Sequence, residues 1–270
     1  MGRGMATDGV DAGVLGGGMA YLATGAGEPL VVLSGLTASN APPTGAERTR
    51  TVQEIRPFAH GRRVWWINRP PGLAPGTTMA DLAADTAAVL RATFPGPVDV
   101  IGASTGGVLA LQLAVDHPDV VRRLVLRAAA CRLSDTGKAG QARIAALVRA
   151  GHGRRAMAAT GAMATARAWT RPLVGALVGL SPVPKDLSDM LVTLEAEDAV
   201  DLEPRLGQVP APVLVVGGDR DRFYGDLLAH TAELLPDARL VLLPGVGHFG
   251  AFTDRRVTAA IAEFLGPPTA

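Results

Sequence analysis

The stretch GASTG at positions 102–106 sets a serine between two glycines, directly after the apolar run VDVI. The spacing G-x-S-x-G is typical of a sharp turn between a strand and a helix, where the serine hydroxyl is exposed as a nucleophile. A side chain at 102 or 106 would clash with the packed strand and helix, which explains the glycines. A chain with 33 glycines also forms such a pentapeptide by chance, so a nucleophilic Ser104 requires a base and an acid elsewhere.

The best candidate for the base is His248, which lies in LPGVGHFGAF, a glycine-flanked loop after the last apolar run. An imidazole suits this role because its ordinary pKa lies near neutral pH. We expect the other histidines to be structural or to lie on the surface. His60 precedes a strand, His117 ends the helix after Ser104, and His152 and His230 lie in helical segments.

Two aspartates compete for the acid that would orient the imidazole, both in VLVVGGDRDRFYG. Asp219 follows the glycine pair directly, and we expect it to shape the turn. Asp221 reaches further from the strand end toward the His248 loop, and we favour it as the acid. Its role would be to hold the imidazole tautomer and to stabilise the imidazolium.

Backbone N–H groups near Ser104 are candidates for stabilising an oxyanion. The N–H of Thr105 begins the helix after the serine, and the N–H of Leu36 lies in the loop LVVLSGLTASN. Gly35 would let this loop approach the substrate closely, and we expect Gly35 and Phe249 to bind substrate. The alternative for Gly35 is a simple glycine turn.

These loops require a framework that brings them to one edge, and the apolar pattern predicts it. Apolar runs predict strands at 30–33, 64–68, 97–102, 122–129, 212–219 and 239–245. Helical spacing predicts helices at 78–94, 105–118, 224–236 and 258–266. This alternation predicts an α/β fold with a mostly parallel, doubly wound sheet, in which ligands bind at the carboxyl edge.

Residues 133–206 break this alternation, because they hold alanine-rich helical segments and no convincing strand. We expect an all-helical cap here, inserted into a core formed by residues 1–132 and 207–270. Residues 134–172 are basic and residues 173–206 are acidic. We interpret these charges as solvated faces that partly pair across the two halves; the alternative is a basic lid that attracts an anionic substrate.

Composition narrows the classes of function. The 270 residues are 48% hydrophobic with a net charge of +1, which argues against nucleic-acid or membrane-surface binding driven by bulk charge. The single cysteine, Cys131, excludes an internal disulfide, and we expect an inert packing thiol. We find no signal peptide, no membrane-spanning run and no Cys/His cluster with metal-ligand spacing. We therefore expect a cytoplasmic protein without metal or cofactor. Oligomeric state stays open.

With Ser104, Asp221 and His248 in this chain order, the sequence resembles the α/β-hydrolase superfamily over nearly its whole length. The motifs are MAYLATGAGEPLVVLSGL, NRPPG, IGASTGG, HPDVVRRLVL, VLVVGGDRD and GVGHF. The resemblance implies that the helical insertion covers the site. Two features depart from the family pattern: Ser34-Gly35 replaces the common His-Gly, and RFYG follows the acid. Members with an aspartate nucleophile are excluded, because position 104 is serine.

The sequence therefore predicts a serine hydrolase that cleaves an ester or related acyl compound through an acyl-serine intermediate. The same residues could perform acyl transfer, thioester cleavage or C–C bond hydrolysis. A hypothesis of another class is a non-catalytic protein that binds a small ligand under the cap. A small acyl substrate is the expected partner.

Overall fold

The computed structural model describes residues 4–5 and 9–267. The strands of this part of the chain form one nine-stranded sheet. The strands occur in the order β1-β2-β3-β5-β4-β6-β7-β8-β9. From β5 to β9 all neighbouring pairs are parallel, and β1, β2, β3 and β5 pair antiparallel. Their bounds are Gly4–Met5 (β1), Val10–Val14 (β2), Ala20–Gly25 (β3), Glu28–Leu33 (β4), Arg62–Ile67 (β5), Val98–Ala103 (β6), Val121–Arg127 (β7), Val213–Gly218 (β8) and Ala238–Leu243 (β9).

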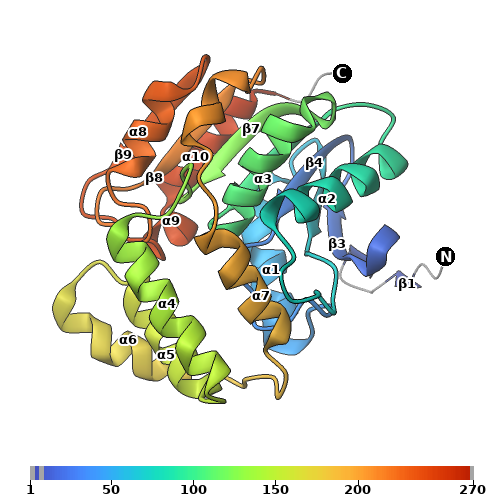
Figure 1. The fold of residues 1–270 in the computed structure, drawn as a ribbon. Coiled ribbons are helices and arrows are strands. Elements are labelled where there is room, and N and C mark those ends of the chain that lie inside the picture. Colours follow the sequence, from blue (N-terminus) through green and yellow to red (C-terminus); the bar gives the residue numbers. More distant parts are fainter. Residues whose placement is uncertain (1–3, 6–8, 268–270) are drawn as a thin grey trace.

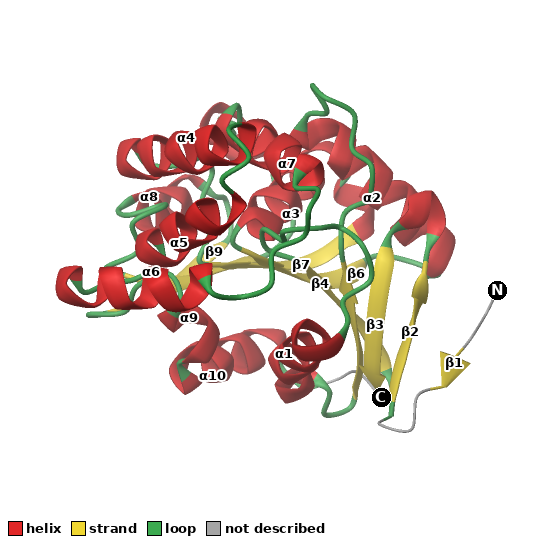
Figure 2. Cartoon of the chain, turned by 90° about the horizontal axis from the view of Figure 1, so that it is seen from below, coloured by secondary structure: helices red, strands yellow, loops and turns green. Residues whose placement is uncertain are grey.

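Helices cover both faces of this sheet, as Figures 1 and 2 show. One face carries α2, α3 and α8, and the other carries α1, α9 and α10. Their bounds are Gly45–Ile55 (α1), Met79–Thr93 (α2), Thr105–Asp116 (α3), Leu227–Leu234 (α8), Gly250–Thr253 (α9) and Arg255–Leu265 (α10).

Alternation along the strands explains why both faces are covered. In β4, Val31 and Leu33 pack into the core on the side of α2 and α3, whereas Leu30 and Val32 pack on the side of α1 and α10. Every residue of β6 and β8 is buried. A strand that is apolar on both faces becomes stable only between two layers of helices, which is the arrangement expected for a parallel sheet.

Four further helices lie between β7 and β8, and no strand occurs in this segment. They stand over one end of the sheet on the side of α3 (Figure 2). A small apolar cluster, centred on Ile144, Met190 and Leu194, packs three of them together and against Leu36. We keep the name cap for these helices, which are Asp135–Arg149 (α4), Gly153–Met163 (α5), Arg171–Gly179 (α6) and Ser188–Asp198 (α7).

The predicted fold class is confirmed, and each predicted strand corresponds to one of β4 to β9. Two local predictions differ. The sequence did not indicate α1, because only Thr51, Val52 and Ile55 of this polar helix are buried. The helix expected at 224–236 is shorter, since Tyr224 and Gly225 form a turn with Gly225 at φ +55°.

Candidate active site

Ser104 occupies a strained turn between β6 and α3. Its backbone angles are φ +53° and ψ −125°, which cost a non-glycine residue roughly 1–3 kcal/mol. The neighbours must be glycine: a Cβ on Gly106 would lie 2.3 Å from the carbonyl oxygen of Leu33. The Ser104 N–H donates to the carbonyl oxygen of Arg127 at 2.9 Å. The turn is therefore fixed by the two strands that flank β6 in the sheet.

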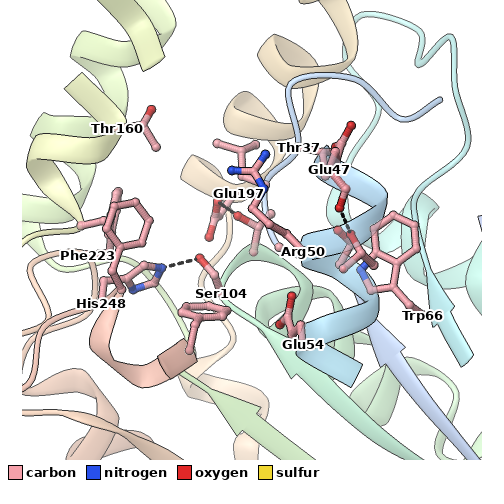
Figure 3. Close-up of a pocket in the computed structure, with 18 of the residues that line it drawn as sticks. Thr37, Glu47, Arg50, Glu54, Trp66, Ser104, Thr160, Glu197, Phe223 and His248 are labelled. Atoms are coloured by element: carbon pink, nitrogen blue, oxygen red, sulfur yellow. Dashed lines mark hydrogen bonds between the residues drawn. The ribbon is translucent and has the colours of Figure 1, made fainter. Parts of the chain in front are cut away.

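A chain of hydrogen bonds joins Ser104 to His248 and Asp221. Figure 3 shows its first bond, between Ser104 and His248. The Nε2 of His248 lies 2.8 Å from the Oγ of Ser104, and its Nδ1 lies 2.6 Å from the Oδ2 of Asp221. Asp221 is 4% exposed, so its carboxylate holds the ring proton on Nδ1 and leaves Nε2 free to accept from the serine. This geometry suits removal of the hydroxyl proton by the imidazole.

The second oxygen of Asp221 accepts two backbone N–H groups, from Phe223 at 2.9 Å and Tyr224 at 3.3 Å. The turn after β8 thus fixes one carboxylate oxygen, and His248 contacts the other. Asp219 is exposed, and its carboxylate accepts the N–H of Gly245 at 2.7 Å. It ties the turn after β8 to the turn after β9, and of the two candidates only Asp221 contacts the imidazole.

The expected oxyanion donors flank the serine. Gly35 comes so close that an added Cβ would lie 3.6 Å from the Cβ of Ser104. Leu36 and Thr105 both line the cavity beside the serine hydroxyl. Neither backbone N–H has a protein acceptor in the part of the chain that the structure describes. Both donors are therefore free to bind an oxygen atom of a ligand.

The cavity in front of Ser104 has a volume of about 280 Å³ and lies between the sheet edge and the cap. Its walls are largely aromatic near His248, where the ring centroid of Phe223 lies 4.8 Å and that of Phe252 lies 5.6 Å from the imidazole. Gly35 and the half-exposed Phe249 also line it, as expected for substrate-binding residues. Figure 3 shows the opposite wall, which is polar and comes from α1: Glu47, Arg50 and Glu54.

Among residues 4–5 and 9–267, no group of three or more His, Cys, Asp or Glu side chains is arranged to hold a metal ion. Nor does this part of the chain contain a helix long and apolar enough to cross a membrane. Cys131 is buried, and burial raises the pKa of its thiol. An inert packing role for this thiol agrees with that environment.

Residues 28–254 match the profile of the family described as "alpha/beta hydrolase fold". The chain belongs to this family. It is 28% identical over 262 residues to "Putative non-heme bromoperoxidase BpoC" of Mycobacterium tuberculosis H37Rv, covering 92% of this chain and 97% of the relative. It is also 28% identical to "Putative carbamate hydrolase RutD" of Variovorax paradoxus, covering 73% of this chain and 76% of that protein.

Solved structures of the alpha/beta hydrolase fold superimpose over nearly the whole chain. The crystal structure of the M. tuberculosis protein has a TM-score of 0.77 at 26% identity and covers 93% of this chain and 97% of the other. An enol-lactonase from Burkholderia xenovorans has a TM-score of 0.75 at 20% identity and covers 97% of this chain and 98% of the other. At this identity the second likeness supports the fold alone.

Arg69 orders the loop in which this hydrolase-family chain departs from the common His-Gly. Its guanidinium donates to the carbonyl oxygens of Ser34 at 2.9 Å and Gly35 at 2.8 Å, and to the Thr37 hydroxyl at 3.2 Å. The side chain is 3% exposed, and burial lowers its pKa to about 10. The motif NRPPG contains this arginine, and a cation directly after a buried strand was the signal in the sequence that could have indicated its role.

Glu197 is a second residue that the sequence analysis missed. We expected it on a solvated face of the cap, and this was wrong, because the residue is 2% exposed. Its carboxylate accepts the Thr105 hydroxyl at 2.8 Å and the Tyr224 hydroxyl at 2.7 Å. Burial raises the pKa of Glu197. A cap helix thus contacts Thr105, directly after the serine, and Tyr224, in the turn after the acid.

The expected charge pairing across the cap is sparse. Arg149 on α4 pairs with Glu195 on α7 at 2.7 Å. Asp189 on α7 instead accepts the N–H of Leu73, in the loop after β5, at 2.8 Å. The acidic half of the cap therefore faces the core as well as the basic half.

Proposed function

We propose that this protein is a serine hydrolase that cleaves a small carboxylic ester or related acyl compound. The observation that carries the proposal is the continuous hydrogen-bonded chain from Ser104 through His248 to Asp221, at the wall of a cavity. In this proposal His248 removes the hydroxyl proton as the Ser104 oxygen attacks the substrate carbonyl carbon.

The attack places negative charge on the carbonyl oxygen, which the free N–H groups of Leu36 and Thr105 would bind. Arg69 would hold the Leu36 loop in place during this step. The intermediate collapses as His248 gives its proton to the leaving alcohol, which leaves an acyl-serine. Water then attacks the acyl carbon while His248 takes its proton, and the acid leaves as Ser104 is regenerated.

A cavity of about 280 Å³ favours a small substrate, since larger ligands require more volume. Phe223, Phe249 and Phe252 supply an apolar wall for an acyl chain or ring. A reducing, cytoplasmic compartment is consistent with the single buried cysteine. The name of the relative from Variovorax paradoxus adds carbamates to the acyl compounds to be tested.

The test is a panel of p-nitrophenyl esters, a thioester, a carbamate and a lactone, run on wild type and Ser104→Ala side by side. We expect the variant to fold normally and to lose at least about 10³-fold in kcat/KM on each accepted substrate. Added alcohol separates transfer from hydrolysis, because transfer yields a new ester. Retention of more than about a tenth of the activity would exclude Ser104 as the nucleophile, and no turnover on any substrate would favour the ligand-binding hypothesis.

A further inference from the structure

A second cavity lies within the cap, on the other side of α5 from the catalytic pocket. Thr160 of α5 and Ala164, directly after this helix, line the catalytic pocket, whereas Ala158 and Ala162 of α5 line this second cavity. It is an open groove of about 1120 Å³ between α4, α5 and α6. These helices pack beside one another at one end of the molecule (Figures 1 and 2). Its floor is made of alanine and glycine, so it leaves room for a ligand.

Four arginines line the groove, and we call it the arginine groove: Arg143, Arg155, Arg171 and Arg222. Asp135 is the acidic residue that lines it, which leaves a formal charge of +3 from four cations and one anion. None of the four guanidinium groups has an acidic partner within 4.0 Å among the described residues. Arg149, on the same helix as Arg143, by contrast pairs with Glu195 at 2.7 Å.

Two of these arginines are close together without a compensating charge. The Nε of Arg171 is buried and has no hydrogen-bond partner among the described residues, although its Nη2 donates to the carbonyl oxygen of Ala166 at 3.3 Å. Burial lowers the pKa of Arg222, and the charge of Arg171 lowers it further. Like charges placed together in this way are unfavourable unless an anion neutralises them.

We propose that the arginine groove binds the phosphate or pyrophosphate group of a small molecule or of a lipid. Guanidinium groups bind phosphate oxygens through paired, charge-assisted hydrogen bonds, and a groove charge of +3 matches a dianion better than a single carboxylate. The alanine and glycine floor would contact the apolar part of the same ligand. This site is separate from the cavity at Ser104 and does not depend on the proposed hydrolysis.

The surface beside the groove is relevant to whether the phosphate belongs to a lipid or to a soluble molecule. From the 3-10 helix Ala168–Thr170 to the end of α6, an apolar side chain recurs at helical spacing and is 59–75% exposed: Trp169, Leu173, Leu177 and Leu180. This apolar stripe lies next to the groove face of α6, which carries Arg171 and Gly175. A lipid surface would contact the stripe as well as the arginines, whereas a soluble phosphate would contact the arginines alone.

The experiment measures binding of inorganic pyrophosphate by calorimetry, and co-sedimentation with phosphatidylglycerol or phosphatidylcholine vesicles. The test variant is Arg171→Gln/Arg222→Gln. Arg171 donates a hydrogen bond to the carbonyl oxygen of Ala166, so its replacement could disturb the fold. A second test variant is therefore Arg143→Gln/Arg155→Gln. The side chains of Arg143 and Arg155 are exposed and make no hydrogen bond among the described residues. The control is Arg154→Gln/Arg167→Gln, which removes two exposed cap cations that do not line the groove.

We expect wild type and the control to bind pyrophosphate, phosphatidylglycerol vesicles or both, and each test variant that folds to bind at least about tenfold more weakly. Pyrophosphate binding alone assigns a soluble ligand. Binding to phosphatidylglycerol vesicles, but not to phosphatidylcholine vesicles, assigns a lipid head group. The proposal is overturned if wild type binds neither probe, or if the control loses as much binding as the test variants, since attraction would then follow bulk charge.

Discussion

The charged side chains at the carboxyl edge of the sheet and those in the arginine groove of the cap differ in their surroundings. At the edge, Asp221 accepts three hydrogen bonds and Arg69 donates three, and both side chains are buried. In the cap, Arg143 and Arg155 have no acidic partner among the described residues, and Trp169 is 75% exposed. Buried charges must be satisfied internally, whereas exposed ones are satisfied by water or by a ligand. The hydrogen bonds at the edge therefore fix the positions of its charged side chains, whereas the charges of the arginine groove can contact a ligand.

The largest effect that this comparison predicts separates the two aspartates after β8. Asp221→Asn should lower kcat by about 10³–10⁴-fold, because the imidazole loses the group that holds its tautomer. Asp219→Asn should lower it by less than about tenfold, because Asp219 only ties two turns together. Steady-state kinetics on the best ester of the panel measures both. A larger loss for Asp219→Asn would overturn the assignment of the acid.

The second prediction compares a glycine of the edge with a glycine of the cap. Gly106→Ala should destabilise the fold by about 3 kcal/mol, because its Cβ would meet backbone oxygens at 2.3 and 2.4 Å. Gly153→Ala should change stability by less than about 1 kcal/mol, because its Cβ would meet only the ends of Leu187 and Val183. Urea unfolding measures the difference. Equal free energies of unfolding for the two variants would contradict the claim that Gly106 is more tightly packed than Gly153.

The third prediction compares an arginine of the edge with an arginine of the cap. Arg69→Met should lower kcat by about 10–100-fold, because the loop that carries the Leu36 N–H loses its ordering bonds. It should also lower the unfolding midpoint, because the buried carbonyl oxygens of Ser34 and Gly35 lose their donor. Arg154→Met, exposed on α5, should leave kcat unchanged. If Arg69→Met keeps full activity, the Leu36 loop does not contribute to the oxyanion site.

The smallest predicted effect is a pH dependence of stability from Glu197. Because burial raises its pKa in the folded protein, the unfolded chain releases this proton first as pH rises above the ordinary value of 4.5. Stability from the neutral carboxyl is thus present below pH 4.5 and is lost as pH rises toward the raised pKa. Glu197→Gln has no carboxyl that titrates at this position, whereas wild type loses stability as the pH rises. The free energy of unfolding of the variant should therefore increase relative to that of wild type between pH 4.5 and pH 7.

Thermal unfolding over this pH range is the measurement. The matched control is Glu195→Gln on the same helix, because that carboxylate is partly exposed and pairs with Arg149 at the surface. A difference between wild type and Glu197→Gln that does not vary with pH would contradict a raised pKa for this buried carboxyl.

The difference between the sheet edge and the cap also explains which residues of the site could be predicted from the sequence. Local pattern was sufficient for Ser104, Asp221 and His248, because each lies in a short loop directly after an apolar strand, and parallel strands bring those loops to one edge. Their roles remain proposals, but the structure brings the three side chains into one hydrogen-bonded chain.

Arg69 and Glu197 could not be placed in this way. Glu197 meets Thr105 across 92 residues of chain, and its neighbours in sequence, Glu195 and Asp198, are less buried. The spacing of Trp169, Leu173, Leu177 and Leu180 is typical of a buried helix face, yet the structure exposes all four. In the cap, tertiary contacts rather than local pattern decide which face is buried.

The central claim is that Ser104 is a nucleophile activated by His248, and active-site labelling tests it most directly. The folded protein is treated with a fluorophosphonate and the modified peptide is identified by mass spectrometry, with heat-denatured protein and Ser104→Ala as controls. We predict a single phosphonyl adduct on Ser104 that forms only in the folded wild type. A folded wild-type protein that stays unlabelled, or that carries the adduct elsewhere with Ser104 unmodified, would contradict the claim.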